Sequence, residues 1–325
     1  MEKNILILGY NFFGYENEIL KELSKKYNVK YVNLENNFLE RTYSYILKKT
    51  IGNEKRNLFI IKLWNKKINK IIKNEFNIDI LFVLGIFNLK KENFIFLDKT
   101  YNIKNKKLYL WDTIQRIENF YEYRKYFNEI YSFDKKDCDT FQLIYRPTFF
   151  SKRLERLENI KNIYKFSFVG AHSLKRENFL KKILDQNSKN NFVYLYLDFF
   201  MYIKKYIFDI KYKLNNFKFF KISKEKYNLI MSQSEIIIDL LQFNQTGVTQ
   251  RSLDALYLKK KIITDNKYIK NYDFYNPNNI LIINENTTRK EIEEFQNKEY
   301  IEIDKNIISY YSIERWVQDI FESEE

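Results

Sequence analysis

The residues best placed to do chemistry lie in one stretch, residues 242–266, which reads QFNQTGVTQRSLDALYLKKKIITDN. A polar loop ends at Gly247, a short helix that Thr249 can cap follows, and an apolar strand comes next. Gly247 would let the backbone approach an anion, and the first free amides of the helix would point at the bound charge. Arg251 and Asp254 share a helical face, where an arginine could pair with a phosphate and a carboxylate could accept hydrogen bonds from a ribose. The pattern indicates a sugar-phosphate site, with a capped surface helix in a βαβ unit as the alternative.

A second segment, FVGAHSLKR, follows an earlier strand and has the same character. We expect Gly170 to permit a tight turn off the strand, and we expect the side chains that follow to supply donors for a diphosphate: Ser173, Lys175 and Arg176. His172 is the only histidine of the chain, so a histidine metal cluster is not expected. Two roles stay open for it, a ligand contact and a structural loop residue.

An acid that could act as a general base stands in the first half of the chain. Asp112 follows the apolar run that ends in YLW and precedes a predicted helix. At the end of a strand it could deprotonate a hydroxyl nucleophile, or it could simply cap the next helix. Asp134 has a similar position, and we interpret it as an N-cap. The segment GYNFFG, residues 9–14, has the glycine spacing of a P-loop without its Lys-Ser/Thr, and it predicts a strand-to-helix turn.

Metal and disulfide chemistry are not expected. Cys138 is the only cysteine, and Asp137 and Asp139 have a metal-ligand spacing but fall in a predicted helix. Basic side chains and helix dipoles would then stabilise a leaving diphosphate without metal. No cofactor is expected.

The chain of 325 residues has a net charge of +14, which could suggest nucleic acid. Lysines are scattered and interleaved with acids, so we expect a solvated basic surface and no nucleic-acid partner. Peripheral association with an anionic membrane is the weaker alternative. No apolar run is long enough to span a membrane, and the N-terminus reads as a first strand, so a cytoplasmic protein is expected, with the inner face of the membrane as a further location.

Strand-like and helix-like segments alternate along the whole sequence, which predicts parallel sheets covered on both faces. The expected strands are residues 3–8, 29–34, 57–62, 79–84, 107–110, 129–133, 165–169, 192–197, 217–222 and 235–240. Beyond the helix that Thr249 caps, helices are expected at 117–127, 177–184, 224–231 with Ser223 as N-cap, and 307–321. The fold class is α/β with two Rossmann-like domains facing across a cleft. We place the domains at 1–150 and 151–305, with a C-terminal helix in 306–325 that crosses back to the first domain.

These motifs together resemble the bacterial GT-B-type glycosyltransferases of the lipopolysaccharide and capsule biosynthesis group, which includes the CgeB-like proteins. The similarity covers most of the chain and rests on YLWD, IYSFDKKD, FSFVGAHSLKR, YNLIMSQSEIIIDL, NQTGVTQRSLDAL, KKIITDNKYIKNYDFYNPNNILII and YSIERW. The resemblance implies a nucleotide-sugar donor held by the second domain and a glycan or lipid-linked acceptor held by the first.

The resemblance also implies the site. Donor-side residues would be Gly170, His172, Ser173, Arg176, Gln245, Thr246, Gly247, Thr249, Arg251 and Asp254, and Asp112 would be the catalytic base. Asp254 falls where relatives usually have a glutamate that contacts the ribose. Thr246, eight residues earlier, breaks the paired-glutamate pattern of many retaining enzymes. Retention and inversion both stay open, and we favour inversion. The alternative is a catalytically silent GT-B relative that binds nucleotide or glycan as a scaffold.

Overall fold

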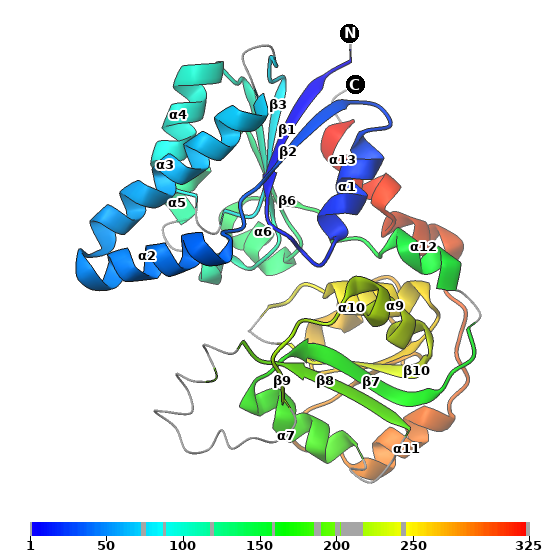
Figure 1. Cartoon of the computed structure of the whole chain (residues 1–325). Coiled ribbons are helices and arrows are strands. Elements are labelled where there is room, and N and C mark those ends of the chain that lie inside the picture. Colours follow the sequence, from blue (N-terminus) through cyan, green and yellow to red (C-terminus); the bar gives the residue numbers. More distant parts are fainter. Residues whose placement is uncertain are drawn as a thin grey trace. The chain divides into compact units, whose positions relative to one another are not determined.

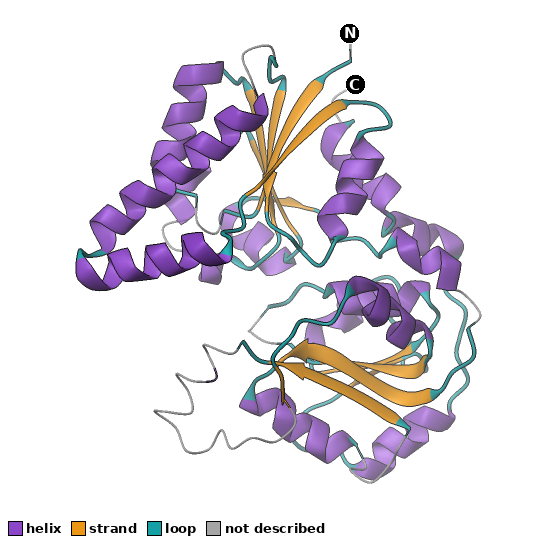
Figure 2. Ribbon diagram, in the orientation of Figure 1, coloured by secondary structure: helices purple, strands orange, loops and turns teal. Residues whose placement is uncertain are grey.

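The computed structural model describes residues 2–72, 76–86, 89–117, 120–157, 160–184, 190–198, 202, 217–241 and 245–322. The chain divides into two compact units. The N-terminal unit comprises Met1–Pro147 together with Val317–Glu325, and the C-terminal unit comprises Thr148–Trp316. Each unit is a parallel sheet with helices on both faces (Figure 1 and Figure 2).

The N-terminal unit contains a six-stranded sheet in the order β2-β1-β3-β4-β5-β6. Its strands are β1 (Asn4–Gly9), β2 (Asn28–Asn33), β3 (Ile80–Leu84), β4 (Asn105–Leu110), β5 (Glu129–Ser132) and β6 (Ile144–Tyr145). Its helices are α1 (Tyr15–Leu23), α2 (Phe38–Thr50), α3 (Asn53–Ile72), α4 (Lys91–Tyr101), η1 (Ile114–Arg116), α5 (Phe120–Arg124) and α6 (Lys135–Phe141). Figure 1 shows α2 to α5 on one side of the sheet and α1 on the other, beside the end of the last helix, α13 (Ile313–Phe321).

The C-terminal unit repeats the architecture with the strand order β12-β11-β10-β7-β8-β9. Its strands are β7 (Tyr164–Ala171), β8 (Asn191–Tyr196), β9 (Phe217–Lys218), β10 (Ser234–Asp239), β11 (Lys261–Thr264) and β12 (Ile280–Ile282). Its helices are η2 (Lys152–Leu157), α7 (Leu174–Ile183), α9 (Lys224–Ser232), α10 (Gln250–Tyr257), η3 (Lys267–Asn271), α11 (Arg289–Asn297) and α12 (Lys305–Tyr310). Every strand pairing in both sheets is parallel, as the near-continuous apolar strands predict.

One sequence prediction of an element is wrong, and three others are right only in part. Residues 57–62 form no strand; they lie inside α3, which buries side chains at helical spacing: Ile60, Trp64, Ile68 and Ile72. The predicted strand 217–222 is only two residues long in the structure. Of the predicted helix 117–127, only the short α5 is formed among the described residues; the 3-10 turn η1 ends before this range, at Arg116, and residues 118–119 lie outside the described residues. The predicted helix 307–321 is interrupted between α12 and α13, where Ser312 accepts a hydrogen bond from the amide of Arg315 and so starts a new helix.

The last helix returns to the N-terminal unit. Lys107 of β4 is buried and donates to the carbonyl of Ile320 at 2.9 Å, while Arg146 and Asp319 form an ion pair at 3.0 Å. The Phe321 ring packs edge-on against Phe82 of β3. A cation at the C-terminal end of a helix satisfies a carbonyl that lacks an intrahelical partner. These contacts explain why Val317–Glu325 belongs to this unit.

Candidate donor site in the C-terminal unit

The two motifs that the sequence singles out meet at one edge of the C-terminal sheet. Strands β7 and β10 are neighbours in the middle of the sheet, and the chain leaves them in opposite directions, toward β8 and β9 and toward β11 and β12. Open α/β sheets bind ligands beyond the carboxyl ends of the strands at such a switch point. Gly170–Ser173 ends and follows β7, and Gln245–Thr249 follows β10, with residues 242–244 outside the described residues. The described parts of both predicted donor segments therefore share the edge where a ligand is expected.

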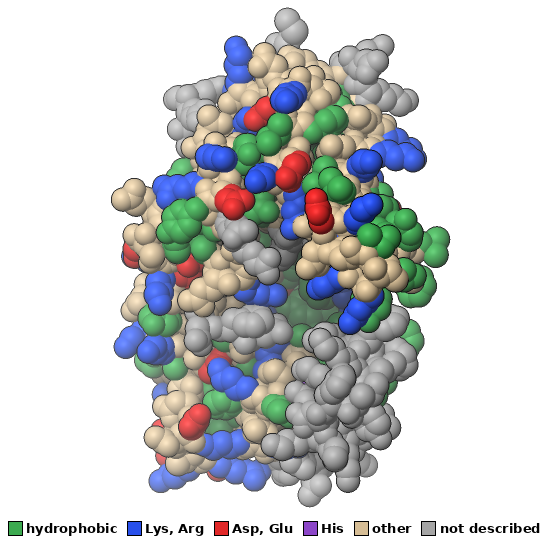
Figure 3. Space-filling model, turned by 90° about the vertical axis from the view of Figure 1, so that its left-hand side faces the viewer, with side chains coloured by type: hydrophobic (Ala, Val, Ile, Leu, Met, Phe, Trp, Pro, Cys, Tyr) green, Lys and Arg blue, Asp and Glu red, His purple; other side chains and the backbone are tan. Residues whose placement is uncertain are grey.

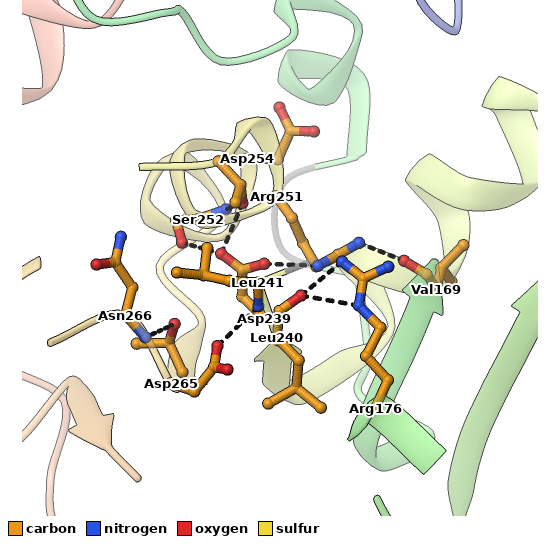
Figure 4. Close-up of polar contacts among 12 residues, drawn as sticks. Val169, Arg176, Asp239, Leu240, Leu241, Arg251, Ser252, Asp254, Asp265 and Asn266 are labelled. Atoms are coloured by element: carbon orange, nitrogen blue, oxygen red, sulfur yellow. Dashed lines mark hydrogen bonds and ion pairs between the residues drawn. The ribbon is translucent and has the colours of Figure 1, made fainter. Parts of the chain in front are cut away.

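Asp239 organises this edge, although the sequence reasoning missed it. Its carboxylate is 1% exposed and accepts hydrogen bonds from Arg251 Nη1 at 2.5 Å, Thr249 Oγ1 at 2.6 Å and Ser252 Oγ at 2.5 Å (Figure 4). Thr249 also caps α10, as predicted, because its hydroxyl accepts from the amide of Ser252. A negative charge beside a helix N-terminus is stabilised by the helix dipole. Asp239 could have been found by the signal that selected Asp112, an acid at the end of an apolar strand.

Two arginines join the ends of β7 and β10. Arg251 Nη2 donates to the carbonyl of Val169 at 2.5 Å, and Arg176 donates to the carbonyls of Leu240 and Ala171 (Figure 4). Both guanidinium groups also lie over the buried ring of Phe168, at 5.2 Å for Arg251 and 5.7 Å for Arg176. Burial, and then the nearby positive charge of Arg251, lower the pKa of Arg176 to about 10. Arg176 therefore stays charged at neutral pH, and its guanidinium lies with that of Arg251 at the predicted phosphate site.

Gly170 serves a different purpose from the predicted one. It does not turn the chain off the strand, because β7 continues to Ala171 and Gly170 pairs in register with Leu195. A Cβ atom at this position would lie 2.9 Å from Cζ of Phe168 and 3.1 Å from Nη2 of Arg251. The glycine is needed because the guanidinium of Arg251 and the ring of Phe168 occupy the space that a side chain would fill.

The loop before α10 is held by the side chains of Asn266 and Tyr272, which lie outside it in the sequence. Asn266 donates to the carbonyls of Thr246 and Gly247 at 3.4 and 3.2 Å, and Gln245 also donates to the Gly247 carbonyl at 3.4 Å. The amide of Val248 donates to the hydroxyl of Tyr272. The predicted donor residues Gln245, Thr246 and Gly247 thus belong to a fixed loop, which is the pre-organisation that an anion site requires.

The predicted donors that follow β7 are engaged within the protein. Ser173 caps α7 by accepting from the amide of Arg176, and Lys175 forms an ion pair with Asp265 at 2.6 Å. The imidazole of His172 is fully buried and lies 3.0 Å from Glu177. His172 is therefore a packed residue that lies just before Ser173, the N-cap of α7, and its contact with a ligand stays a prediction.

Asp254 points away from the Asp239 cluster and has no exposed surface (Figure 4). Its carboxylate accepts from the amide of Ser151 at 2.8 Å and from the hydroxyl of Tyr227 at 3.3 Å, and Lys224 Nζ lies 3.9 Å away. Burial, and then the negative charge of Asp254, raise the pKa of Tyr227 well above its usual value, so the phenol remains a donor. A ribose contact by Asp254 would require these bonds to open, and that role stays a prediction.

Several donors remain for a ligand at this edge. The amides of Gln250 and Arg251 lie in the first turn of α10, where a helix offers no internal acceptor. Nε of Arg251 is buried and has no hydrogen-bond partner among the described residues. Two guanidinium groups, a helix N-terminus and a fixed loop are elements of the kind found in sites that bind a diphosphate through charge-assisted hydrogen bonds.

In the N-terminal unit, Asp112 lies just beyond β4 and forms an ion pair with Arg116 of η1. It does not cap η1: Thr113 is the N-cap residue, and the Ile114 amide donates to Asp137. Trp111 stacks on Phe12 with ring centroids 5.0 Å apart. The structure thus leaves Asp112 beside a guanidinium and an aromatic pair at the carboxyl edge of the sheet.

The loop of residues 9–14 is a strand-to-helix turn, as predicted, with Gly14 at the N-cap of α1 and φ +86°. The amides of Phe12 and Gly14 donate to the carboxylate of Glu16 at 2.9 and 3.1 Å. Amides that would cradle a phosphate in a P-loop are occupied here by a carboxylate of the same chain. This loop therefore differs from a phosphate-binding loop in its contacts as well as in its sequence.

No protein-family model matches the chain, and no curated protein matches its sequence. Solved structures match it over nearly the whole length. Sucrose-phosphate synthase from Thermosynechococcus elongatus matches with TM-score 0.60 and 6% identity, covering 99% of this chain and 98% of the other. The Anabaena protein Alr3699/HepE, solved with UDP-glucose, matches with TM-score 0.59 and 8% identity, covering 98% of each chain. UDP-GlcNAc 2-epimerase from Methanocaldococcus jannaschii matches with TM-score 0.56 and 12% identity, covering 99% and 100%. The chain has the GT-B fold.

The predicted donor site and the predicted catalytic base lie in different Rossmann-like domains. The Asp239 cluster and α10 belong to the second domain, and Asp112 belongs to the first. Within the described ranges, no group of three or more His, Cys, Asp or Glu side chains is arranged to hold a metal ion. Among the helices in those ranges, none is long and apolar enough to span a membrane.

Proposed function

We propose that this GT-B protein is a glycosyltransferase that transfers a sugar from a nucleotide-sugar to a glycan or lipid-linked acceptor. The observation that carries the proposal is the charge arrangement at the β7–β10 switch point, where Arg176, Arg251 and the N-terminus of α10 meet. Two structural neighbours support the choice of donor, because Alr3699/HepE was solved with UDP-glucose and an α-glucosyltransferase was solved with UDP and DNA. The resemblance in sequence motifs favours bacterial surface polysaccharide synthesis in the cytoplasm.

In this mechanism the donor diphosphate binds at the first turn of α10. The amides there and the two guanidinium groups stabilise the negative charge that develops on the leaving diphosphate. Asp239 keeps Arg251 in place, so that the guanidinium is oriented before the donor arrives. No metal ion has a role in this scheme, because the positive charge comes from side chains and the helix dipole.

Asp112 is the proposed catalytic base. Its carboxylate would take the proton of the acceptor hydroxyl as the oxygen attacks the anomeric carbon. Direct attack on the face opposite the leaving diphosphate inverts the anomeric configuration, and we therefore favour inversion. Arg116 would orient the carboxylate through the ion pair.

The proposal is tested by screening nucleotides and nucleotide-sugars for a rise in melting temperature, followed by an assay for nucleotide release with glycan acceptors. A ligand that binds only the folded state stabilises it, by about 2.7 kcal/mol at a hundred times its dissociation constant. We expect stabilisation by one nucleoside diphosphate and its sugar conjugate, and turnover that persists in EDTA. The absence of stabilisation by every nucleotide-sugar would reject the donor assignment, and turnover that EDTA abolishes and Mg²⁺ restores would reject the metal-free scheme.

A silent GT-B binding protein is the second candidate, and one observation favours it. The side chains of Ser173, Lys175 and Asp254 are all engaged with protein groups, which leaves fewer donors for a ligand than the sequence predicts. A glycosyltransferase would transfer the sugar of its donor to an acceptor, whereas a silent protein would bind the donor without transfer. Nucleotide-sugar binding without sugar transfer to any acceptor, unchanged by Asp112→Asn, would support the silent protein.

A further inference from the structure

The α2–α3 hairpin carries a surface that neither the fold nor the donor site explains. Seven large apolar side chains in this short stretch are exposed, by fractions between 47% and 77%: Phe38, Leu39, Tyr43, Tyr45, Ile46, Ile51 and Leu58. Most exposed apolar side chains in proteins are scattered singly, whereas a cluster of this kind marks an interaction surface.

Five of the exposed side chains belong to α2, whereas Ile51 follows this helix and Leu58 lies on α3. Ser44 and Leu47 are the buried residues of this helix, and the hydroxyl of Ser44 accepts a hydrogen bond from Arg56 of α3. At 100° per residue, Phe38, Tyr45 and Ile46 project from the opposite side. Most of the apolar side chains of α2 are therefore exposed to solvent, and Leu47 alone among them is buried.

The same hairpin concentrates the positive charge of the chain. Residues 38–72 contain nine Lys or Arg and only two Glu, against 56 and 42 in the whole chain. This stretch, about a tenth of the sequence, therefore accounts for half of the net charge of +14. Lys48 and Lys49 are exposed on α2 and Lys55 on α3, and Figure 3, which views the side where the two helices meet, shows hydrophobic side chains with Lys and Arg among them.

We propose that the α2–α3 hairpin docks the protein onto an anionic lipid surface. Exposed aliphatic and aromatic side chains beside lysines are the composition of helices that lie in the membrane interface, with the apolar side chains inserted and the cations at the headgroups. Each lysine near an anionic leaflet adds to the attraction. Leu39, Ile46 and Ile51 favour lipid over nucleic acid, because aliphatic side chains make no favourable contact with a phosphate backbone. The inference does not depend on transferase activity, since it concerns another surface.

The test is co-sedimentation of the full chain with vesicles of phosphatidylcholine alone and of phosphatidylcholine with phosphatidylglycerol, at physiological ionic strength and without donor or acceptor. We expect binding to the anionic vesicles and much weaker binding to the neutral ones. Leu39→Gln/Ile46→Gln should weaken binding by about tenfold or more, because two inserted side chains lose their transfer free energy. Lys48→Gln/Lys49→Gln should also weaken it by about tenfold or more.

Matched controls separate the hairpin from general surface effects. Ile163→Gln/Leu229→Gln removes two exposed aliphatic side chains, and Lys290→Gln/Lys305→Gln removes two exposed lysines, all in the C-terminal unit. Both controls should bind like the wild type, and all four variants should keep its melting temperature. The proposal fails if the wild type ignores anionic vesicles or if Leu39→Gln/Ile46→Gln binds them normally. It also fails if a DNA duplex binds instead and the apolar variant leaves that binding intact.

Discussion

Replacing Arg251 with alanine should destabilise the protein as well as weaken donor binding. The substitution leaves Asp239, which is 1% exposed, with the hydroxyls of Thr249 and Ser252 as its side-chain donors among the described residues, and it removes a donor to the Val169 carbonyl. Breaking a buried ion pair by removing one partner typically costs about 3–5 kcal/mol. The Arg251 side chain is 14% exposed and two hydroxyls remain on the carboxylate, so we expect about 2–3 kcal/mol.

Such a loss corresponds to a fall in melting temperature of about 4–12 °C for a unit of this size. The measurement is thermal and urea unfolding followed by circular dichroism, alongside Arg289→Ala as a control. Arg289 forms an exposed pair with Glu293, and its removal should cost about 0–0.5 kcal/mol. The double variant Arg251→Ala/Asp239→Asn should recover part of the loss, because it removes the isolated buried charge.

Ligand binding to the same variant separates the two roles of Arg251. A nucleoside diphosphate should bind roughly 10–100-fold more weakly, since a charge-assisted hydrogen bond is worth about 1.5–3 kcal/mol, whereas the nucleoside alone should bind nearly as before. An unchanged melting temperature would refute the account of the Asp239 ion pair. Equal losses for nucleoside and nucleotide would show that Arg251 does not contact phosphate.

Three further predictions concern single residues. Gly170→Ala should destabilise the protein by about 1–3 kcal/mol, because its Cβ would crowd Phe168 and Arg251, and a melting temperature equal to that of the wild type would contradict this. Asp112→Asn should reduce sugar transfer by about 10²–10⁴-fold at unchanged donor affinity and stability, and near-normal turnover would remove Asp112 from the mechanism. Burial raises the pKa of the Cys138 thiol to about 12, so it should react with a thiol reagent only after unfolding, and a rapid reaction of the native protein would be the contrary result. Because the pKa of the unfolded thiol is about 8.5, the free energy of unfolding should fall as pH rises above that value, and that of Cys138→Ala should fall less steeply in the same urea titrations.

Local signals in the sequence predicted much of the fold. The caps at Ser223, Thr249 and Asp134 are confirmed, because each is a bond between a side chain and a backbone only two or three residues away. The alternation of apolar strands with helices is also confirmed, because the hydrophobic pattern of each segment is a local signal as well. The error at residues 57–62 arose because a short apolar run fits a strand and a helix equally well, and only the longer spacing through Trp64 and Ile68 identifies α3.

The partners of the site residues could not be predicted. The sequence placed Arg251 at a helix start, but its contact with Val169 joins residues 82 positions apart and depends on the neighbouring positions of β7 and β10. Asp254 was placed on the correct helix, yet its burial against Ser151 and Tyr227 follows from how α9 and η2 pack, which no local pattern encodes. Gly170 was predicted from the sequence to permit a tight turn. In the structure the glycine instead leaves room for Arg251, a side chain that is distant in sequence.

The bond from Lys107 to Ile320 has a consequence for the order in which the chain is made. The carbonyl that accepts from this buried lysine leaves the ribosome only after the whole C-terminal unit, Thr148–Trp316, has been synthesised. At the usual 5–20 residues per second, that interval is roughly ten to thirty seconds. During it, the sheet of the N-terminal unit is present while the helix that covers Phe82 and Lys107 is missing. The first unit to emerge is therefore the last to be completed, and its exposed face during synthesis is a natural substrate for chaperones.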